Sequence, residues 1–344
     1  MKVSKSVSAR FTAALMLAAI FTNLDASAAE NDAAEYFRGR QITLAYSSLE
    51  AYNRLLARHL PKYLPGSPKV IVQDIGGAGG LILANQTFNT ARKDGTFLAM
   101  IRGSTLQSHV NGDPAAKFDG RKFAWIGNMN KEHDGCIVWN PSNVQSMGDL
   151  YTKELIFGAS GAGSQSYTFP LVYNAILQTK FKLIPGYGGL ESRLIAMERG
   201  ELMGGCGYNT GTIKSQMATQ YQERKFRLLF QGGLSKDKDF ADVPNILDQA
   251  KNEADRQALQ YLFATLELGR PFAAPAETPP DRVAFLRAVF DQTMKDPDLL
   301  AEANKLLMPI DGMNADETAT AVARLYATPP AVISRVEGVL NSRQ

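Results

Sequence analysis

The segment that most clearly suggests chemistry is residues 158–166, which read GASGAGSQS. It follows a short apolar run and leads into a helical pattern that begins near Ser164. Its backbone N–H groups and hydroxyls, at the positive end of a helix dipole, favour a carboxylate or a phosphate. A plain helix N-cap at Ser164 is the alternative, but capping needs one hydroxyl and this segment supplies three. The predicted anion contacts are Ser160, Gly161, Gly163, Ser164 and Gln165.

The chain lacks the residue patterns that catalysis or a metal site would need. The nucleophile elbow G-x-S-x-G would require glycine at position 162, where the chain has Ala162. The spacing of the histidines and cysteines matches no metal-ligand pattern. These residues are His59, His109, His133, Cys136 and Cys206. We therefore predict a protein that is not an enzyme, without catalytic residues, metal or cofactor, and an exported hydrolase is the weakest alternative.

Other loops hold weaker candidates. The glycine cluster at 76–80 matches the dinucleotide fingerprint only in part, because Ile82 stands where the third glycine should be, and a tight turn explains it better. Arg102 ends an apolar run, where its guanidinium could bind a carboxylate or form a structural ion pair. Arg270 has a similar placement and less weight. Tyr187 either closes one side of a cleft or packs in the interior.

Short apolar runs alternate with helical patterns along most of the chain. We predict strands at 41–46, 69–74, 96–102, 123–127, 136–139, 155–158, 181–185, 201–206 and 226–231. We predict helices at 52–63, 81–91, 164–178 and 190–197, and an almost entirely helical chain from 279 onward. This alternation is typical of an α/β protein with doubly wound, mostly parallel sheets, and 344 residues suggest two of them. Ligands of such sheets bind at the carboxyl ends of the strands.

The N-terminus has the three parts of a secretory signal. Lys2, Lys5 and Arg10 form a basic head, an apolar run follows at 11–21, and small residues at 26–28 form a cleavage site. As a helix the apolar run spans about 16 Å, too short for about 30 Å of hydrocarbon. We predict a signal peptide at 1–28 and a soluble protein exported to the periplasm, with a buried N-terminal helix as the alternative.

Charge and cysteine content narrow the class further. The chain has 37 Lys and Arg against 34 Asp and Glu, a balance too even for a protein that binds nucleic acid through its phosphates. Cys136 and Cys206 are its two cysteines, and in an oxidising compartment they predict one disulfide. Two buried free thiols on neighbouring strands are the alternative.

Several segments form a familiar set in their order and spacing. They include LLARHLP at 55–61, GAGG at 77–80, KDGT at 93–96, FGASGAGS at 157–164, GYGG at 186–189, ERGE at 198–201, DVP at 242–244, RPFAAP at 270–275 and ATPP at 327–330. This set resembles the substrate-binding receptors of tripartite tricarboxylate transporters, also called Bug receptors. The resemblance covers about residues 38–340.

The resemblance implies a periplasmic solute-binding protein with a Venus-flytrap fold, in which a cleft separates two α/β lobes. Residues 29–133 and 234–344 would form lobe 1, and residues 134–233 would form lobe 2. Such a receptor captures a small carboxylate by hinge closure and delivers it, as a monomer, to an integral-membrane permease. A receptor that presents its ligand to a membrane sensor kinase is the alternative.

The resemblance also implies that the first strand–helix loop of each lobe holds the ligand. In lobe 1 this loop offers Ser47 and Ser48, with Arg102 nearby, while Tyr187 and Tyr208 would shape the cleft. The loop departs from the family pattern, because residues 45–52, AYSSLEAY, contain no glycine. Hydroxyls or the Arg102 guanidinium would then replace backbone donors.

Overall fold

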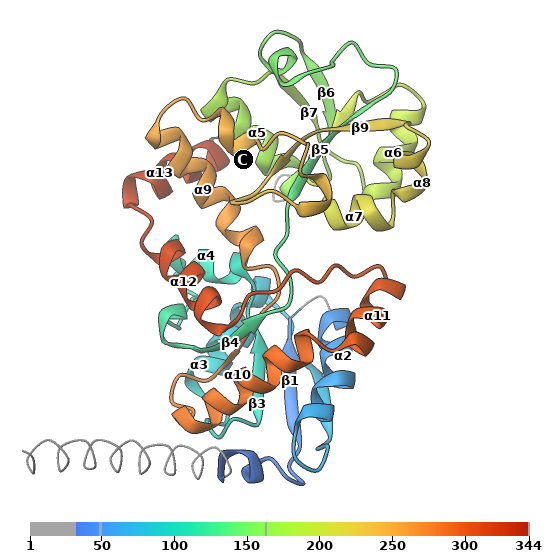
Figure 1. Ribbon diagram of the computed structural model, residues 1–344. Helices are drawn as coiled ribbons and strands as arrows, with labels where there is room; N and C mark the ends of the chain where they lie inside the picture. The colour runs from blue at the N-terminus through green and yellow to red at the C-terminus, as the bar shows by residue number, and fades with distance from the viewer. Residues whose placement is uncertain (1–31, 48–49, 162–163, 343–344) are drawn as a thin grey trace, which may run out of the picture.

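The protein is described by a computed structural model that covers residues 32–47, 50–161 and 164–342. Its strands form two five-stranded sheets, each inside one of the two α/β bodies visible in Figure 1. We call them the first lobe and the second lobe, and they confirm the predicted two-sheet α/β fold. The predicted signal peptide lies outside the described residues. Within them, no helix is long and apolar enough to cross a membrane.

The first sheet has the strand order β2-β1-β3-β10-β4. Its strands are β1 (Ile42–Tyr46), β2 (Val70–Asp74), β3 (Phe97–Met100), β4 (Ala124–Asn128) and β10 (Pro271–Ala274). β1 pairs in parallel with β2 and β3, whereas β10 runs antiparallel to both β3 and β4. All of β1 is buried, as expected for a strand that helices cover on both faces.

Helices and short 3-10 turns surround the first sheet. They are α2 (Glu50–His59), η1 (Leu60–Tyr63), η2 (Ala78–Gly80), α3 (Leu81–Asn89), α4 (Gly103–Val110), η3 (Gly120–Lys122), α10 (Pro280–Met294), α11 (Pro297–Lys305) and α12 (Ala315–Tyr326). Local sequence sets several boundaries. Asp296 caps α11, and Asn314 forms a capping box with Glu317 at the start of α12.

The second sheet has the order β7-β6-β8-β5-β9. Its strands are β5 (Asp134–Trp139), β6 (Leu155–Gly158), β7 (Phe181–Ile184), β8 (Gly204–Gly205) and β9 (Phe226–Gly232). Around it lie η4 (Met147–Tyr151), α5 (Gln165–Leu177), α6 (Leu190–Glu198), α7 (Thr210–Ser215), α8 (Ala218–Gln222), η5 (Lys238–Phe240) and η6 (Ile246–Gln249). β5 runs antiparallel to β8 and β9, so each sheet is mixed: its fourth strand is reversed, and the other four run in one direction, as the predicted mostly parallel sheets require.

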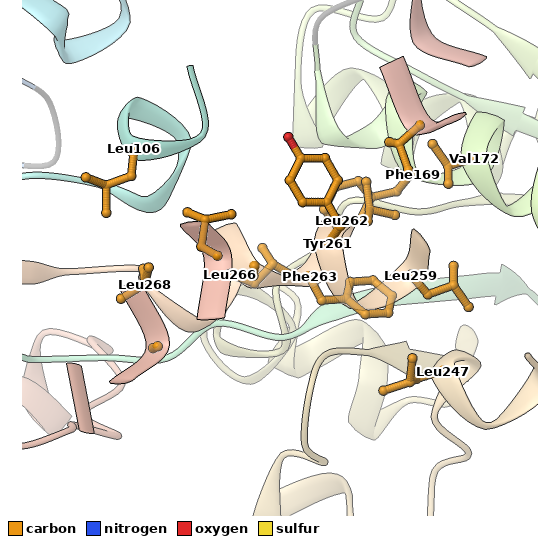
Figure 2. Packing of buried hydrophobic residues seen from close by; sticks show 14 of the residues in the cluster. Leu106, Phe169, Val172, Leu247, Leu259, Tyr261, Leu262, Phe263, Leu266 and Leu268 are labelled. Atoms are coloured by element: carbon orange, nitrogen blue, oxygen red, sulfur yellow. The ribbon is translucent and has the colours of Figure 1, made fainter. Parts of the chain in front are cut away.

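One helix joins the lobes, and a second packs beside it. α9 (Glu253–Glu267) packs against α5 of the second lobe and against α4 and α12 of the first, and α13 (Pro330–Asn341) packs against α9 and α5. Figure 2 shows the apolar side chains of α9 between Leu106 of α4 and Phe169 of α5. After β9 the chain reaches the first sheet again only at β10. The predicted lobe boundaries stay a prediction, because α9 and α13 fall in the range assigned to lobe 1.

Cys136 of β5 and Cys206, which follows β8, form a disulfide. Their Cα atoms are 4.1 Å apart, and both residues are fully buried. The predicted disulfide is therefore confirmed, and the alternative of two free thiols is wrong.

Candidate functional site

One edge of each sheet gathers strand ends that are far apart in the sequence. In the first sheet β1 and β3 end at this edge, and the reversed strand β10 begins there. Arg102, after β3, and Arg270, before β10, therefore start from the same edge. In the second sheet β6 and β8 end where the reversed strand β5 begins, which brings Asp134 to the loops after Gly158 and Gly205. These edges are where α/β sheets bind ligands.

Arg270 is a buried cation with a relative exposure of 7%. Its Nη2 pairs with the carboxylate of Glu132, and its Nη1 donates to the Gly269 carbonyl at 2.7 Å. The guanidinium lies 4.7 Å from the centre of the Tyr52 ring, a cation–π arrangement. Its Nε is buried and has no hydrogen-bond partner among the residues that the structure describes.

Arg102 occupies the N-cap position of α4 and is half-buried. Burial lowers the pKa of its guanidinium, the positive charge of Arg270 lowers this pKa further, and Glu132 raises it. Gly103 allows this placement, because a Cβ there would lie 2.7 Å from the carbonyl oxygen of Thr265 in α9. The start of α4 therefore packs directly on α9, near the chain segment that leads to Arg270.

Ser47 lies at the end of β1, against the glycine cluster. A Cβ on Gly80 would lie 3.0 Å from Ser47 Oγ and 2.5 Å from Thr105 Oγ1. Gly80 also has a φ of 95°, a conformation that favours glycine. The cluster thus allows close packing, in agreement with its interpretation as a tight turn. Ser48 lies outside the described residues.

Ser160, Ser164 and Ser166 form a hydrogen-bonded group at the start of α5, which we call the serine cluster. The hydroxyls of Ser164 and Ser166 are 2.9 Å apart, and the N–H of Ser160 donates to Ser166 Oγ at 3.1 Å. Ser164 occupies the N-cap position, but its hydroxyl donates to the Gly161 carbonyl at 2.7 Å and caps no helix N–H. The N-cap alternative is therefore wrong for this side chain.

The expected backbone donors of this loop have other partners. The N–H of Ser160 is bonded to Ser166, and the N–H of Gly161 donates to Ser164 Oγ at 3.3 Å. These two N–H groups would have to leave their serine partners before they could bind an anion. Gln165 is half-buried in the first turn of α5, and Gly163 lies outside the described residues.

The two tyrosines predicted to shape the cleft differ in placement. Tyr187, in the loop after β7, is half-buried. It lies beside the last residue of β6, since a Cβ on Gly158 would be 3.2 Å from its ring. Tyr208 is only 1% exposed, and the Arg193 guanidinium lies 4.2 Å from the centre of its ring. Arg193 in turn donates to the Cys206 carbonyl at 3.0 Å. Tyr208 is therefore a core residue that supports the loops from inside, which corrects its prediction as a cleft surface.

A cavity of about 390 Å³ lies between the lobes. Tyr52, Arg270 and Met308 line it from the first lobe, Asn209 and Lys214 from the second. Its volume is within the roughly 300–1,000 Å³ that small-molecule sites occupy. Sequence reasoning did not single out Tyr52 or Asn209. The available signals were that Tyr52 ends the loop segment 45–52 and that Asn209 follows Tyr208.

No family model matches the chain, and no curated protein does. Solved structures do match. A TctC solute-binding protein from Polaromonas has a TM-score of 0.69 and 18% identity, over 87% of this chain and 98% of its own. The periplasmic binding protein BugD has a TM-score of 0.54 and 16% identity, over 88% and 96%. MatC from Rhodopseudomonas palustris, solved with bound malate, has a TM-score of 0.53 and 18% identity, over 88% of this chain and 99% of its own.

These structures match nearly their whole length to this chain, at identities that carry information on the fold alone. They agree with the resemblance that the sequence motifs indicate. The chain therefore has the two-lobed fold of the TctC and Bug solute-binding proteins.

Proposed function

We propose that this chain is an exported receptor that captures a small carboxylate between its lobes and delivers it to a membrane permease of the tripartite tricarboxylate type. The observation that carries the proposal is the buried guanidinium of Arg270, which lines the cavity, together with the half-buried Arg102 at the same edge of the first sheet. A guanidinium presents a planar fork of donors that matches a carboxylate. The malate bound by MatC, a protein of the same fold, supports this ligand class.

The ligand would be held from both lobes. The first lobe offers the arginine pair and the hydroxyls of the loop after β1, and the second offers the serine cluster at the positive end of α5. Hinge closure would remove the ligand from water and strengthen each charge-assisted bond. The proposed contacts are Ser47, Ser48, Arg102, Ser160, Gly161, Gly163, Ser164, Gln165 and Tyr187, together with Arg270.

Three further parts of the proposal rest on the motif resemblance and the shared fold. The receptor acts in the periplasm after removal of residues 1–28, it acts as a monomer, and it binds its ligand without altering it. The permease that receives the ligand is part of a tripartite tricarboxylate transporter.

A calorimetric titration with malate, succinate and citrate tests the proposal. We expect at least one of these acids to bind, and Arg102→Ala and Ser164→Ala to weaken its binding by about 1–3 kcal/mol, the range for hydrogen bonds to charged groups. Arg199→Ala and Ser334→Ala, at exposed positions, serve as matched controls and should leave affinity unchanged. Absence of binding by all three acids, or unchanged affinity in both site variants, would refute the proposal.

A further inference from the structure

Asp134 is a buried carboxyl group that the proposed capture of a ligand does not use. It begins β5 and is 1% exposed. Its Oδ1 accepts from the N–H of Gly207 at 2.8 Å, and its Oδ2 accepts from the Tyr173 hydroxyl at 3.1 Å. Burial of a carboxyl group is costly, and these two hydrogen bonds offset part of that cost.

Gly207 connects Asp134 to the serine cluster. Gly207 has a φ of 78°, and a Cβ there would lie 2.6 Å from the backbone nitrogen of Ser166. Ser166 Oγ in turn accepts from the N–H of Ser160 and contacts Ser164 Oγ. The carboxyl of Asp134 therefore fixes the backbone on which the serine cluster rests.

The charges that face Asp134 come from each element packed around it. α5 contributes the Tyr173 hydroxyl, and α6 contributes the Arg193 guanidinium, whose charge lowers the pKa of Asp134. Cys136 of β5 and Cys206, which follows β8, contribute the disulfide, which carries no charge. Burial outweighs these effects and raises the pKa of Asp134 to about 7. His133, the preceding residue, faces Ser235, and burial lowers its pKa.

We propose that Asp134 is the positioning residue of the serine cluster, and that the protein takes up a proton at Asp134 when an anion binds there. The inference rests on the proposed capture of a carboxylate. The negative charge of an anion at the serine cluster would raise the pKa of Asp134, and we take roughly one unit as the size of this increase at an effective dielectric constant of about 20. From a pKa of about 7, this shift corresponds at pH 7 to an uptake of about 0.4 proton.

Protonation leaves the geometry intact. The protonated Oδ2 donates to the Tyr173 hydroxyl oxygen, while Oδ1 keeps the bond from Gly207. Asp134→Asn reproduces this arrangement, because its amide can donate to Tyr173 and its carbonyl can accept from Gly207. Asp134→Ala removes both bonds. The two variants therefore separate the charge of Asp134 from its positioning role.

The proton is counted by titrating malate into the protein at pH 7 in buffers of different ionisation enthalpy. We expect an uptake of about 0.4 proton in the natural protein and in His133→Gln, and close to none in Asp134→Asn. We expect Asp134→Asn to bind malate with an affinity that is constant from about pH 6.5 to pH 8, where both malate carboxyl groups are ionised. Equal uptake in the natural protein and Asp134→Asn would overturn the proton linkage.

The positioning role is read without a ligand, by amide hydrogen exchange at residues 158–161 and 205–208. We expect faster exchange in Asp134→Ala than in Asp134→Asn, and unchanged exchange in Asp134→Asn. Equal exchange in the two variants would overturn positioning by Asp134. If malate bound to no form of the protein, both the proton linkage and the proposed capture of malate would be refuted. The hydrogen-exchange comparison would still test the positioning role of Asp134, because it needs no ligand.

Discussion

Reduction of the Cys136–Cys206 disulfide gives a direct test of how the second lobe is held together. β8 is only two residues long, so its pairing with β5 supplies few backbone hydrogen bonds. The disulfide follows β8 immediately and joins two residues 70 positions apart. Reduction leaves both sulfur atoms in the core and removes the cross-link alone.

The expected loss follows from the length of the loop. Closing a loop of 70 residues removes chain entropy from the unfolded state that corresponds to about 4 kcal/mol at 25 °C. At about 2–4 °C per kcal/mol, the Tm should fall by roughly 10 °C. Because Gly207 follows Cys206, the reduced protein should also bind its ligand more weakly.

Differential scanning calorimetry with and without a phosphine reductant measures this effect, and alkylation followed by mass spectrometry confirms that both thiols are free. The variant Cys136→Ala/Cys206→Ala is the control, since the reductant should not change its Tm. A fall of less than about 3 °C in fully reduced natural protein would refute the reasoning. The backbone pairing and packing of β8 would then suffice without the cross-link.

Two further predictions concern the same region. Gly207→Ala should destabilise the protein more than Gly200→Ala in urea unfolding, by about 1–3 kcal/mol. Both glycines have a positive φ, but only Gly207 has a close neighbour, Ser166. Equal losses of stability in the two variants would contradict the effect of this contact. The pKa of Asp134 is about 7 in the folded protein, above its ordinary value of 3.8. The folded state therefore binds this proton more tightly than the unfolded state does. As a result, the free energy of unfolding should decrease as the pH rises from about 4 to about 7. The urea midpoint of Asp134→Asn should lack this decrease, and a parallel decrease in both proteins would assign it to other groups.

Local sequence patterns identified most of the strands and several helices. They failed for elements whose buried residues follow no simple helical or alternating pattern. The runs at 155–158 and 181–185 lie between turn residues, and the structure has β6 and β7 there. α9 was not predicted. Its buried residues, which include Leu259, Tyr261 and Leu262, face both lobes and therefore form no single apolar stripe. β10 was missed because four residues are too few to show alternation.

The candidate site was predictable only where it follows the end of a parallel strand. Ser160 and Arg102 were found in this way, since each follows a short apolar run. Arg270 was expected to follow a strand, as Arg102 does, and Asp134 was not a site candidate, whereas the structure places both at the beginning of a strand. Such a residue reaches the ligand edge only if its strand is reversed, and local sequence does not encode strand direction.

The two sheets place Arg270 and Asp134 at equivalent positions. In the orders β2-β1-β3-β10-β4 and β7-β6-β8-β5-β9, the fourth strand is the reversed one in each sheet. Arg270 immediately precedes that strand in the first sheet, and Asp134 is its first residue in the second. The first lobe thus presents a fixed positive charge at the edge where the second lobe holds a buried group that can accept a proton. A carboxylate between the lobes would be attracted by the guanidinium, and protonation of Asp134 would relieve its repulsion from the second lobe.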